Sequence, residues 1–224
     1  IGEDIFTPCD EDEVILCLNY NGKFGLNNMN LYFQNANNNS EPFTWAEWTF
    51  KIGDKVIFVD TKRSALLYNN LKGKIVNISK NESSITFTLD VDTVLNEQQC
   101  LGEDFEFIKA DHKSTRIRLI VLADDENITE ENRLKTIIPF QIAYAVSIHK
   151  AQGLEFNSVK IIIPPVNAER ITHSIFYTAI TRAKEQLKIY WSAETMKTII
   201  SSFTDLSVKQ QSLDIIKKKL LSEE

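Results

Sequence analysis

The fold class of this chain is decided by residues 142–191, where short apolar runs alternate with a polar string and a helix-like stretch. This part begins IAYAVSIHKAQGLEFNSVKIII (residues 142–163) and continues, after two prolines and a short link, AERITHSIFYTAITRAKEQLKIYW (residues 168–191). The expected strands are its three apolar runs, at residues 142–146, 159–163 and 187–191. Residues 168–184 lie between the last two runs and predict a helix. Because strands that alternate with helices build mostly parallel sheets, the sequence predicts an α/β fold.

A different pattern fills the middle of the chain, where short β-branched runs are separated by turn residues. These runs lie at residues 55–59, 73–78, 84–89 and 115–121. The other expected elements are a strand at residues 14–18 and helices at residues 26–34, 193–202 and 207–221. We therefore expect a discontinuous α/β domain of residues 1–50 and 132–224, into which residues 51–131 insert a small antiparallel barrel or sandwich.

The composition is that of an ordinary globular protein, with 43% hydrophobic and 25% charged residues among 224. No apolar run approaches the roughly 20 residues of a membrane span, so no membrane partner is expected. The chain starts at Ile1 without a targeting signal, and we expect it to be a piece of a longer cytoplasmic protein. The three cysteines show no CxxC spacing and lie far from the histidines, so reduced thiols are expected and no metal site.

The charge is unevenly distributed along the chain, although the net charge is −6. Residues 51–80 hold seven basic and two acidic side chains, and residues 131–190 hold eight basic and four acidic ones. These two segments are the candidate surfaces for anionic ligands. Each block can alternatively be a solvated face with no ligand.

A polar stripe marks the helix expected at residues 170–184. Its members, which share one face at helical spacing, are Ser174, Tyr177, Thr178, Thr181 and Arg182. The planar donor group of arginine suits phosphate oxygens, so Arg182 is a candidate phosphate ligand. The alternative is a surface arginine that pairs with a nearby carboxylate.

The string at residues 147–156 follows an expected strand, and ligands of open α/β sheets bind beyond the carboxyl ends of strands. Lys150 offers a point charge for phosphate, and Gly153 allows close approach of the backbone to a ligand. Glu155 cannot favour phosphate and is expected to accept from a ribose hydroxyl or to orient an arginine. For His149 alone, a structural histidine is an equal alternative.

These strings resemble motifs V and VI of the superfamily 1 helicases, in the RecD-like and Dda-like branch and more distantly UvrD. The resemblance rests on IHKAQGLEF at residues 148–156 and FYTAITRAKEQLKIYW at residues 176–191. Residues 25–34 are similar to a segment of RecD-like proteins, and residues 53–56 and 67–75 resemble the signature of their small β-barrel insert. The resemblance implies a RecA-like α/β domain of the P-loop-NTPase type, without its own P-loop, that carries an inserted Src-homology-3-like barrel.

The resemblance also implies roles for single residues. Arg182 matches the catalytic arginine that reaches the γ-phosphate of ATP held by another domain. The residues expected on the nucleotide side are Gln152, Gly153, Glu155, Thr181 and Arg182. The residues expected to contact nucleic acid are Ser147, His149, Lys150, Tyr177, Lys55 and Lys74.

The sequence has no GxxxxGK[ST] string, which would cradle the phosphates of ATP. We therefore expect ATP and Mg²⁺ to be bound mainly by a preceding N-terminal RecA-like domain, and the chain alone to be inactive. The expected partners are that domain, ATP, and single-stranded DNA or a duplex junction. Two alternatives stay open: a non-catalytic module that binds nucleic acid or protein, and the equivalent half of an RNA helicase.

Overall fold

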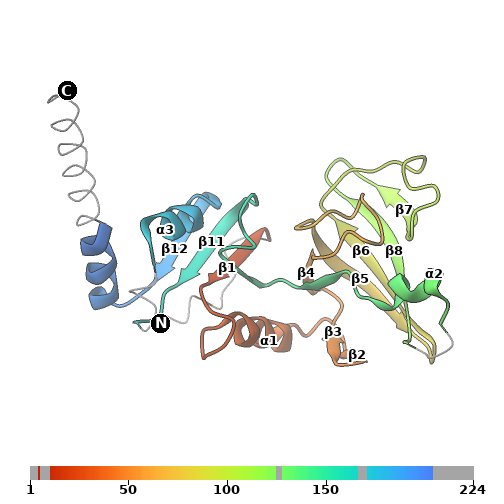
Figure 1. Cartoon of the computed structure of the whole chain (residues 1–224), viewed down its shortest axis with the longest axis horizontal. Helices are drawn as coiled ribbons and strands as arrows, with labels where there is room; N and C mark the ends of the chain where they lie inside the picture. Colours follow the sequence, from red (N-terminus) through yellow and green to blue (C-terminus); the bar gives the residue numbers. More distant parts are fainter. Residues whose placement is uncertain (1–4, 6–10, 125–127, 166–170, 204–224) are drawn as a thin grey trace, which may run out of the picture. The chain divides into compact units, whose positions relative to one another are not determined.

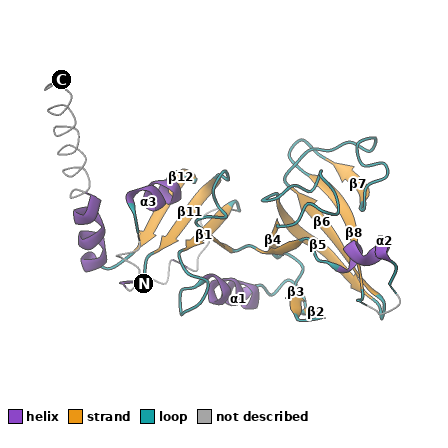
Figure 2. Ribbon diagram, viewed as in Figure 1, coloured by secondary structure: helices purple, strands orange, loops and turns teal. Residues whose placement is uncertain are grey.

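The computed structural model describes residue 5 and residues 11–124, 128–165 and 171–203. The chain forms two compact units, of which one comprises Ile1–Leu26 with Val146–Glu224 and the other Asn27–Ala145. Figures 1 and 2 show their helices and strands. The helix expected at residues 207–221 lies outside the described residues. Within the described residues, no helix is both long and apolar enough to cross a membrane.

The first unit contains a four-stranded sheet. Its strands, in spatial order, are β10 (Ala145–Ser147), β1 (Glu13–Cys17), β11 (Phe156–Ile162) and β12 (Ala183–Tyr190). β1 pairs with β11 and β11 with β12 in parallel register. Every residue of β1 is buried, as expected for a strand covered on both faces. The α/β class predicted from the sequence is therefore confirmed, with helix α3 (His173–Ile180) and a helix over residues 193–203 beside the sheet.

The second unit is built around an antiparallel sheet of six strands. In spatial order they are β7 (Glu106–Ala110), β8 (Thr115–Leu122), β6 (Ser84–Val91), β5 (Lys72–Lys80), β4 (Lys55–Phe58) and β9 (Phe140–Ile142). The unit also holds most of helix α1 (Leu26–Ala36), the hairpin of β2 (Phe43–Trp45) and β3 (Trp48–Phe50), and α2 (Glu130–Arg133), which leads into a 3-10 turn (Leu134–Thr136).

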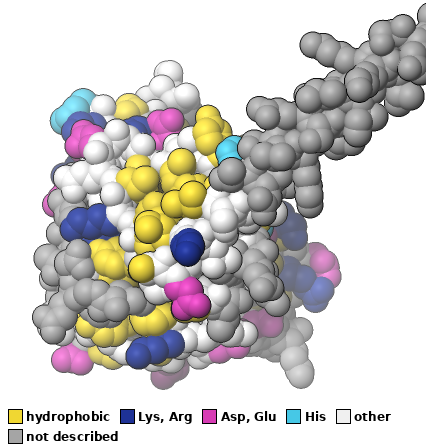
Figure 3. Space-filling model, turned by 90° about the vertical axis from the view of Figure 1, so that its left-hand side faces the viewer, with side chains coloured by type: hydrophobic (Ala, Val, Ile, Leu, Met, Phe, Trp, Pro, Cys, Tyr) yellow, Lys and Arg dark blue, Asp and Glu magenta, His cyan; other side chains and the backbone are white. Residues whose placement is uncertain are grey.

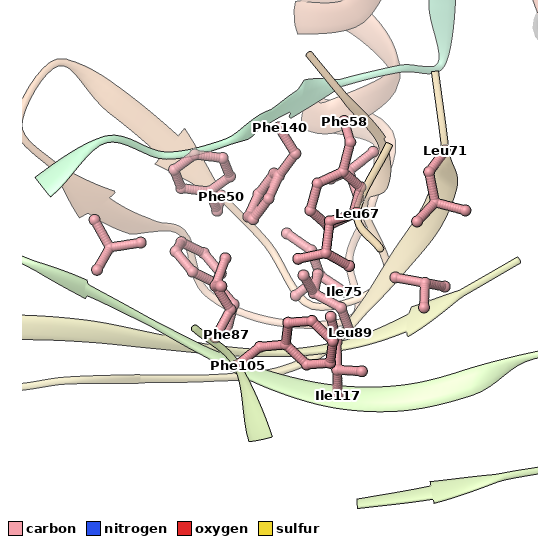
Figure 4. Close-up of a cluster of buried hydrophobic side chains, with 14 of the residues drawn as sticks. Phe50, Phe58, Leu67, Leu71, Ile75, Phe87, Leu89, Phe105, Ile117 and Phe140 are labelled. Atoms are coloured by element: carbon pink, nitrogen blue, oxygen red, sulfur yellow. The ribbon is translucent and has the colours of Figure 1, made fainter. Parts of the chain in front are cut away.

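One face of the six-stranded sheet carries the core of the second unit. Alternate residues of β6 are buried, which is the pattern of a strand with one face against a core. Phe50, Phe58, Phe87 and Phe140 meet edge to face, with ring centres 5.0 to 5.8 Å apart. Figure 4 shows these rings together with the aliphatic side chains that surround them. The other residues of β6, which face away from this core, are polar and partly exposed.

The single strand predicted at residues 142–146 is wrong, because the structure has two strands there. β9 ends at Ile142 and pairs with β4, whereas β10 begins at Ala145 and joins the parallel sheet. The chain changes sheets at Ala143 and Tyr144. The sequence pattern did not reveal this change, because both strands are apolar and only two residues separate them.

The helix predicted at residues 168–184 is shorter in the structure, where α3 spans His173–Ile180 and β12 begins at Ala183. Thr172 caps its start by accepting a hydrogen bond from the backbone N–H of Ile175. At its end, the hydroxyl group of Thr181 bonds to the carbonyl of Tyr177, and the chain turns into the strand. Polar side chains thus end the helix earlier than its apolar pattern indicates.

Candidate functional site

The side chain of Arg182 joins the two strings that the sequence singled out. Its Nε donates to the carbonyl of Thr178 in α3 at 2.9 Å, and its Nη2 donates to Oγ1 of Thr181 at 3.0 Å. Its Nη1 reaches across to the carbonyl of Leu154 at 2.9 Å. The backbone carbonyl of Arg182 accepts from the N–H of Phe156. The end of α3 and the end of the 147–156 string are therefore one structural site within the first unit.

This arrangement fixes the plane of the guanidinium group and leaves donors for a ligand. The three bonds occupy three of its five N–H donors, and the other two are on the two terminal nitrogens. Guanidinium N–H groups suit phosphate oxygens. Arg182 is half-buried, so its position is set by the fold while part of it faces solvent.

The string that follows β10 forms a turn. The carbonyl of Ser147 accepts from the N–H of Ala151 at 3.0 Å, and the hydroxyl of Ser147 accepts from the N–H of Lys150 at 3.3 Å. Ser147 is buried, so its hydroxyl serves the turn. His149 and Gln152 are exposed, and so is Gly153 at a positive φ of 84° with open space around it. The turn thus presents the side chains of His149 and Gln152 and the backbone of Gly153 to solvent.

Glu155 and Arg182 lie at the amino ends of strands, since they directly precede β11 and β12. The sequence had associated the string with the carboxyl end of a strand, which holds for its first residues only. Glu155 forms an exposed ion pair with Lys184 at 3.5 Å. Sequence reasoning missed Lys184, although its place two residues after Arg182 puts it at the same edge.

Tyr177 is an exposed member of the predicted polar stripe, with 59% of its surface accessible. Its ring stacks on that of His173 with the centres 6.4 Å apart. Thr181, by contrast, is committed to the end of the helix through its bonds to Tyr177, Thr178 and Arg182. The stripe therefore divides into an exposed aromatic part and a part that holds the arginine.

A row of charged side chains crosses the polar face of the six-stranded sheet in the second unit. In the strand register, Lys55 lies opposite Lys74, and Lys74 lies opposite Asp90 on the next strand. The row continues through Arg116 to Lys109. The sequence predicted the two lysines of β4 and β5, but not Arg116 and Lys109. The alternation of TRIRLIVL in β8 could have placed Arg116 on the polar face.

The row contains charges of both signs. Arg116 binds Asp90 through two hydrogen bonds of 2.7 Å, and this interaction raises the pKa of Arg116. Lys55 and Lys74 are like charges in directly opposed positions, an arrangement that destabilises a sheet. Lys74 also lies opposite Asp90, so an acidic side chain stands between the lysines and Arg116 in this row.

No metal centre is found in the part of the chain that the structure describes, where no group of three or more metal-ligating side chains lies together. Cys17 and Cys100 are buried free thiols. Burial raises the pKa of Cys17 to about 12, which keeps this thiol protonated and unreactive at neutral pH.

The sequence matches known proteins over the region that contains this site. Residues 142–190 match the family of the UvrD-like helicase C-terminal domain. RecBCD enzyme subunit RecD of Buchnera aphidicola subsp. Schizaphis graminum is 27% identical over 195 residues, which is 84% of this chain and 26% of that protein. This chain thus spans about a quarter of the length of that relative.

Solved structures of Pif1 helicases also align with the chain. The alignment with the structure from Candida albicans covers 90% of this chain and 51% of that chain, at 14% identity and a TM-score of 0.48. The alignment with a Bacteroides structure in complex with ADP-AlF3 and ssDNA covers 87% of this chain and 44% of that chain, at 14% identity and a TM-score of 0.44. By sequence, residues 142–190 are similar to the UvrD-like helicase C-terminal domain, and the chain is related to RecD.

Proposed function

We propose that this chain is the C-terminal motor part of an ATP-dependent DNA helicase, to which it contributes an arginine finger and contacts to single-stranded DNA. A preceding RecA-like domain holds ATP and Mg²⁺, because this sequence has no phosphate-cradling glycine loop. ATP supplies the phosphoryl group for transfer to water. The residues of this chain orient its terminal phosphate and couple the nucleotide to the nucleic acid.

The observation that carries this proposal is the position of the Arg182 guanidinium group. Three bonds to its own unit hold it in one orientation, and its two other donors suit phosphate oxygens. An arginine positioned in this way stabilises the charge of phosphoryl transfer without having to be ordered first. Gln152, Gly153 and Glu155 lie in the string that Arg182 contacts, which supports a role for them on the nucleotide side.

The contacts to DNA are proposed at two places. His149, Lys150 and Tyr177 belong to the first unit, with Ser147 holding the turn behind them. Lys55 and Lys74 belong to the charged row of the second unit, and lysine side chains contact phosphates of nucleic acids. The aromatic ring of Tyr177 is exposed and can stack on a base.

We further propose that the two units correspond to a RecA-like domain and an inserted Src-homology-3-like barrel. The predicted boundaries at residues 50 and 131 stay a proposal, since the compact units divide at residues 26 and 145.

Apolar side chains lie next to one another on the face drawn in Figure 3. Large apolar side chains that are exposed in the first unit include Tyr177, Leu187, Met196 and Ile200. Such exposure supports a protein partner, for which the preceding RecA-like domain is the candidate.

The test is Arg182→Ala in a protein that contains this chain together with the preceding P-loop domain. We expect the kcat of DNA-stimulated ATP hydrolysis to fall about 10³-fold, because the finger is lost, while the affinity for single-stranded DNA is unchanged. Arg133→Ala is the matched control, since Arg133 is an exposed arginine paired only with Glu130 across one helical turn. Turnover of the Arg182 variant close to that of the control would rule out the finger.

A further inference from the structure

The hairpin of β2 and β3 (Figure 1) carries four aromatic side chains on one face. Phe43 lies opposite Phe50 in the strand register. Trp45 lies opposite Trp48, and alternate residues of a strand point to the same side, so all four rings share one face. Three of them, Phe43, Trp45 and Phe50, belong to the core of the second unit or pack against it. Trp48 is different, because 54% of its surface is exposed.

The hairpin is held to the second unit through both of its strands. The side-chain amide of Gln34, in helix α1, donates to the carbonyl of Thr49 at 2.8 Å. Nζ of Lys80, at the end of β5, donates to the carbonyl of Thr44 at 2.7 Å. The same Nζ lies 5.6 Å from the centre of the Trp45 ring, as in a cation–π contact. The backbone that carries the exposed indole is therefore fixed by the rest of its unit.

The two-residue turn at the tip of the hairpin is strained. Ala46, the first residue of this turn, has a φ of 50°, in a region where hairpin turns prefer glycine. Non-glycine residues keep such a backbone only where the surrounding structure imposes it, and they are frequent where ligands are held. A strained turn next to an exposed tryptophan is unfavourable for stability, which points to a function for the tip.

The chemistry of the tip suits a base of a nucleic acid and a phosphate beside it. The indole ring offers a flat π face on which any base can stack. Lys80 is exposed, and its ammonium group has three N–H donors, of which Thr44 accepts one. Glu47 in the turn is also exposed, and its negative charge disfavours phosphate at the tip itself. We therefore expect contact through the ring at Trp48 and contact through charge at Lys80.

We propose that Trp48 stacks on a base of single-stranded DNA and that Lys80 contacts a phosphate near that base. The site lies entirely within the second unit and outside the charged row that contains Lys55 and Lys74. The inference rests on the proposed function for the nature of its ligand. An exposed indole also suits a protein interface, but that occupant predicts no effect of Trp48 on DNA binding.

The first test is the affinity of the chain for a single-stranded oligo(dT). Trp48→Leu removes the π face and keeps an apolar side chain, so we expect the affinity to fall about tenfold. The slope of log affinity against log salt should stay the same, because no charge is lost. Trp48→Phe should recover most of the affinity. Tyr68→Leu is the matched control, since Tyr68 is an exposed aromatic residue of the same unit outside the hairpin.

The phosphate contact is tested by the salt dependence of binding. Lys80→Gln should reduce the slope of log affinity against log salt by about 0.7, the value for one phosphate of a single strand. An unchanged slope in this variant overturns the role of Lys80.

The second test uses the fluorescence of Trp48 itself, since a base that stacks on an indole quenches its emission. Saturating oligo(dT) should quench the emission of the unmodified chain and of Trp191→Phe, which removes an indole of the first unit that stacks on Phe176. The Trp48→Phe chain should lose most of this quenching although it still binds. This measurement needs no loss of affinity, so it decides the proposal even if Trp48→Leu does not fold.

Two results overturn stacking at Trp48. One is equal quenching in the Trp48→Phe chain and the unmodified chain. The other is an affinity of folded Trp48→Leu equal to that of Tyr68→Leu. Either result with normal binding by the unmodified chain contradicts this site alone. Absence of any oligo(dT) binding by the unmodified chain would contradict the proposed function, and the site with it.

Discussion

Lys160 is a fully buried amine in the middle of β11. Its Nζ lies 2.9 Å from Oε1 of Glu13 and also donates to the carbonyl of Ile5. The other carboxylate oxygen of Glu13 accepts from the hydroxyl of Ser158 at 2.8 Å. Two buried charges that satisfy each other add little stability over an apolar pair, but either one alone is strongly unfavourable. The main effect of this pair is therefore that loss of either partner strongly destabilises the pairing of β1 with β11.

Lys160→Ala is expected to lower the free energy of unfolding by about 3–5 kcal/mol, because Glu13 is left buried without its partner. The double change Glu13→Leu with Lys160→Met should restore most of that loss. Urea unfolding of the three proteins measures both effects. A single variant as stable as the double one would show that Glu13 is not buried as described.

The thiol of Cys17 makes the stability of the fold fall as the pH becomes alkaline. Burial raises the pKa of this thiol from 9.0 to about 12 in the folded chain. Its contribution is fully present below pH 9 and is lost as the pH rises from 9 towards 12, because only the unfolded thiol ionises in that range. We expect Cys17→Val to remove about 1.4 kcal/mol of the stability that is lost between pH 8 and pH 10. Urea unfolding at pH 8 and pH 10 checks this, and parallel curves for the two proteins would contradict it.

The end of helix α3 holds Arg182, so it positions the proposed arginine finger. Oγ1 of Thr181 bonds to two helix carbonyls and accepts from Nη2 of Arg182. Thr181→Val keeps the shape and removes the acceptor. In the protein with its P-loop domain, we expect kcat to fall about tenfold to a hundredfold through misplacement of Arg182, with DNA affinity unchanged.

Ser174→Ala is the control for that experiment, because it removes a hydroxyl from the same helix about two turns earlier. An equal effect of both variants on kcat would mean that Thr181 acts only through the stability of the helix.

Elements with a strong local pattern were predictable, and those fixed by distant contacts were not. The buried strand β1 and the alternating strands β6 and β8 were found close to their true ends. The β2–β3 hairpin and β7 were missed, because these strands are short and the sequence does not show which strands they pair with. In the site, the pattern identified Arg182, but its bond to the carbonyl of Leu154 depends on how β11 and β12 pair and could not be read from spacing.

At the scale of the whole molecule, the positive charge that binds DNA is expected on the second unit as well as the first. Single-stranded DNA binding by the chain should weaken with salt, because phosphate contacts release counterions. Changing Lys55 and Lys74 to Gln should reduce the slope of log affinity against log salt by about 1.4. Lys62→Gln serves as the control, since this exposed lysine pairs with Asp60 outside the row. A slope that is the same in all three proteins would exclude the row from the DNA contact.

The central claim is that this chain supplies the arginine and the DNA contacts, while the ATP-binding loop lies in another domain. Its most direct test is the rate of Mg²⁺-dependent ATP hydrolysis with saturating single-stranded DNA. That rate is measured side by side for this chain and for the protein that also contains the preceding P-loop domain. Turnover is expected only for the longer protein, because Arg182 has no bound phosphate to act on without it. Turnover by this chain alone, abolished by Arg182→Ala, would contradict the account.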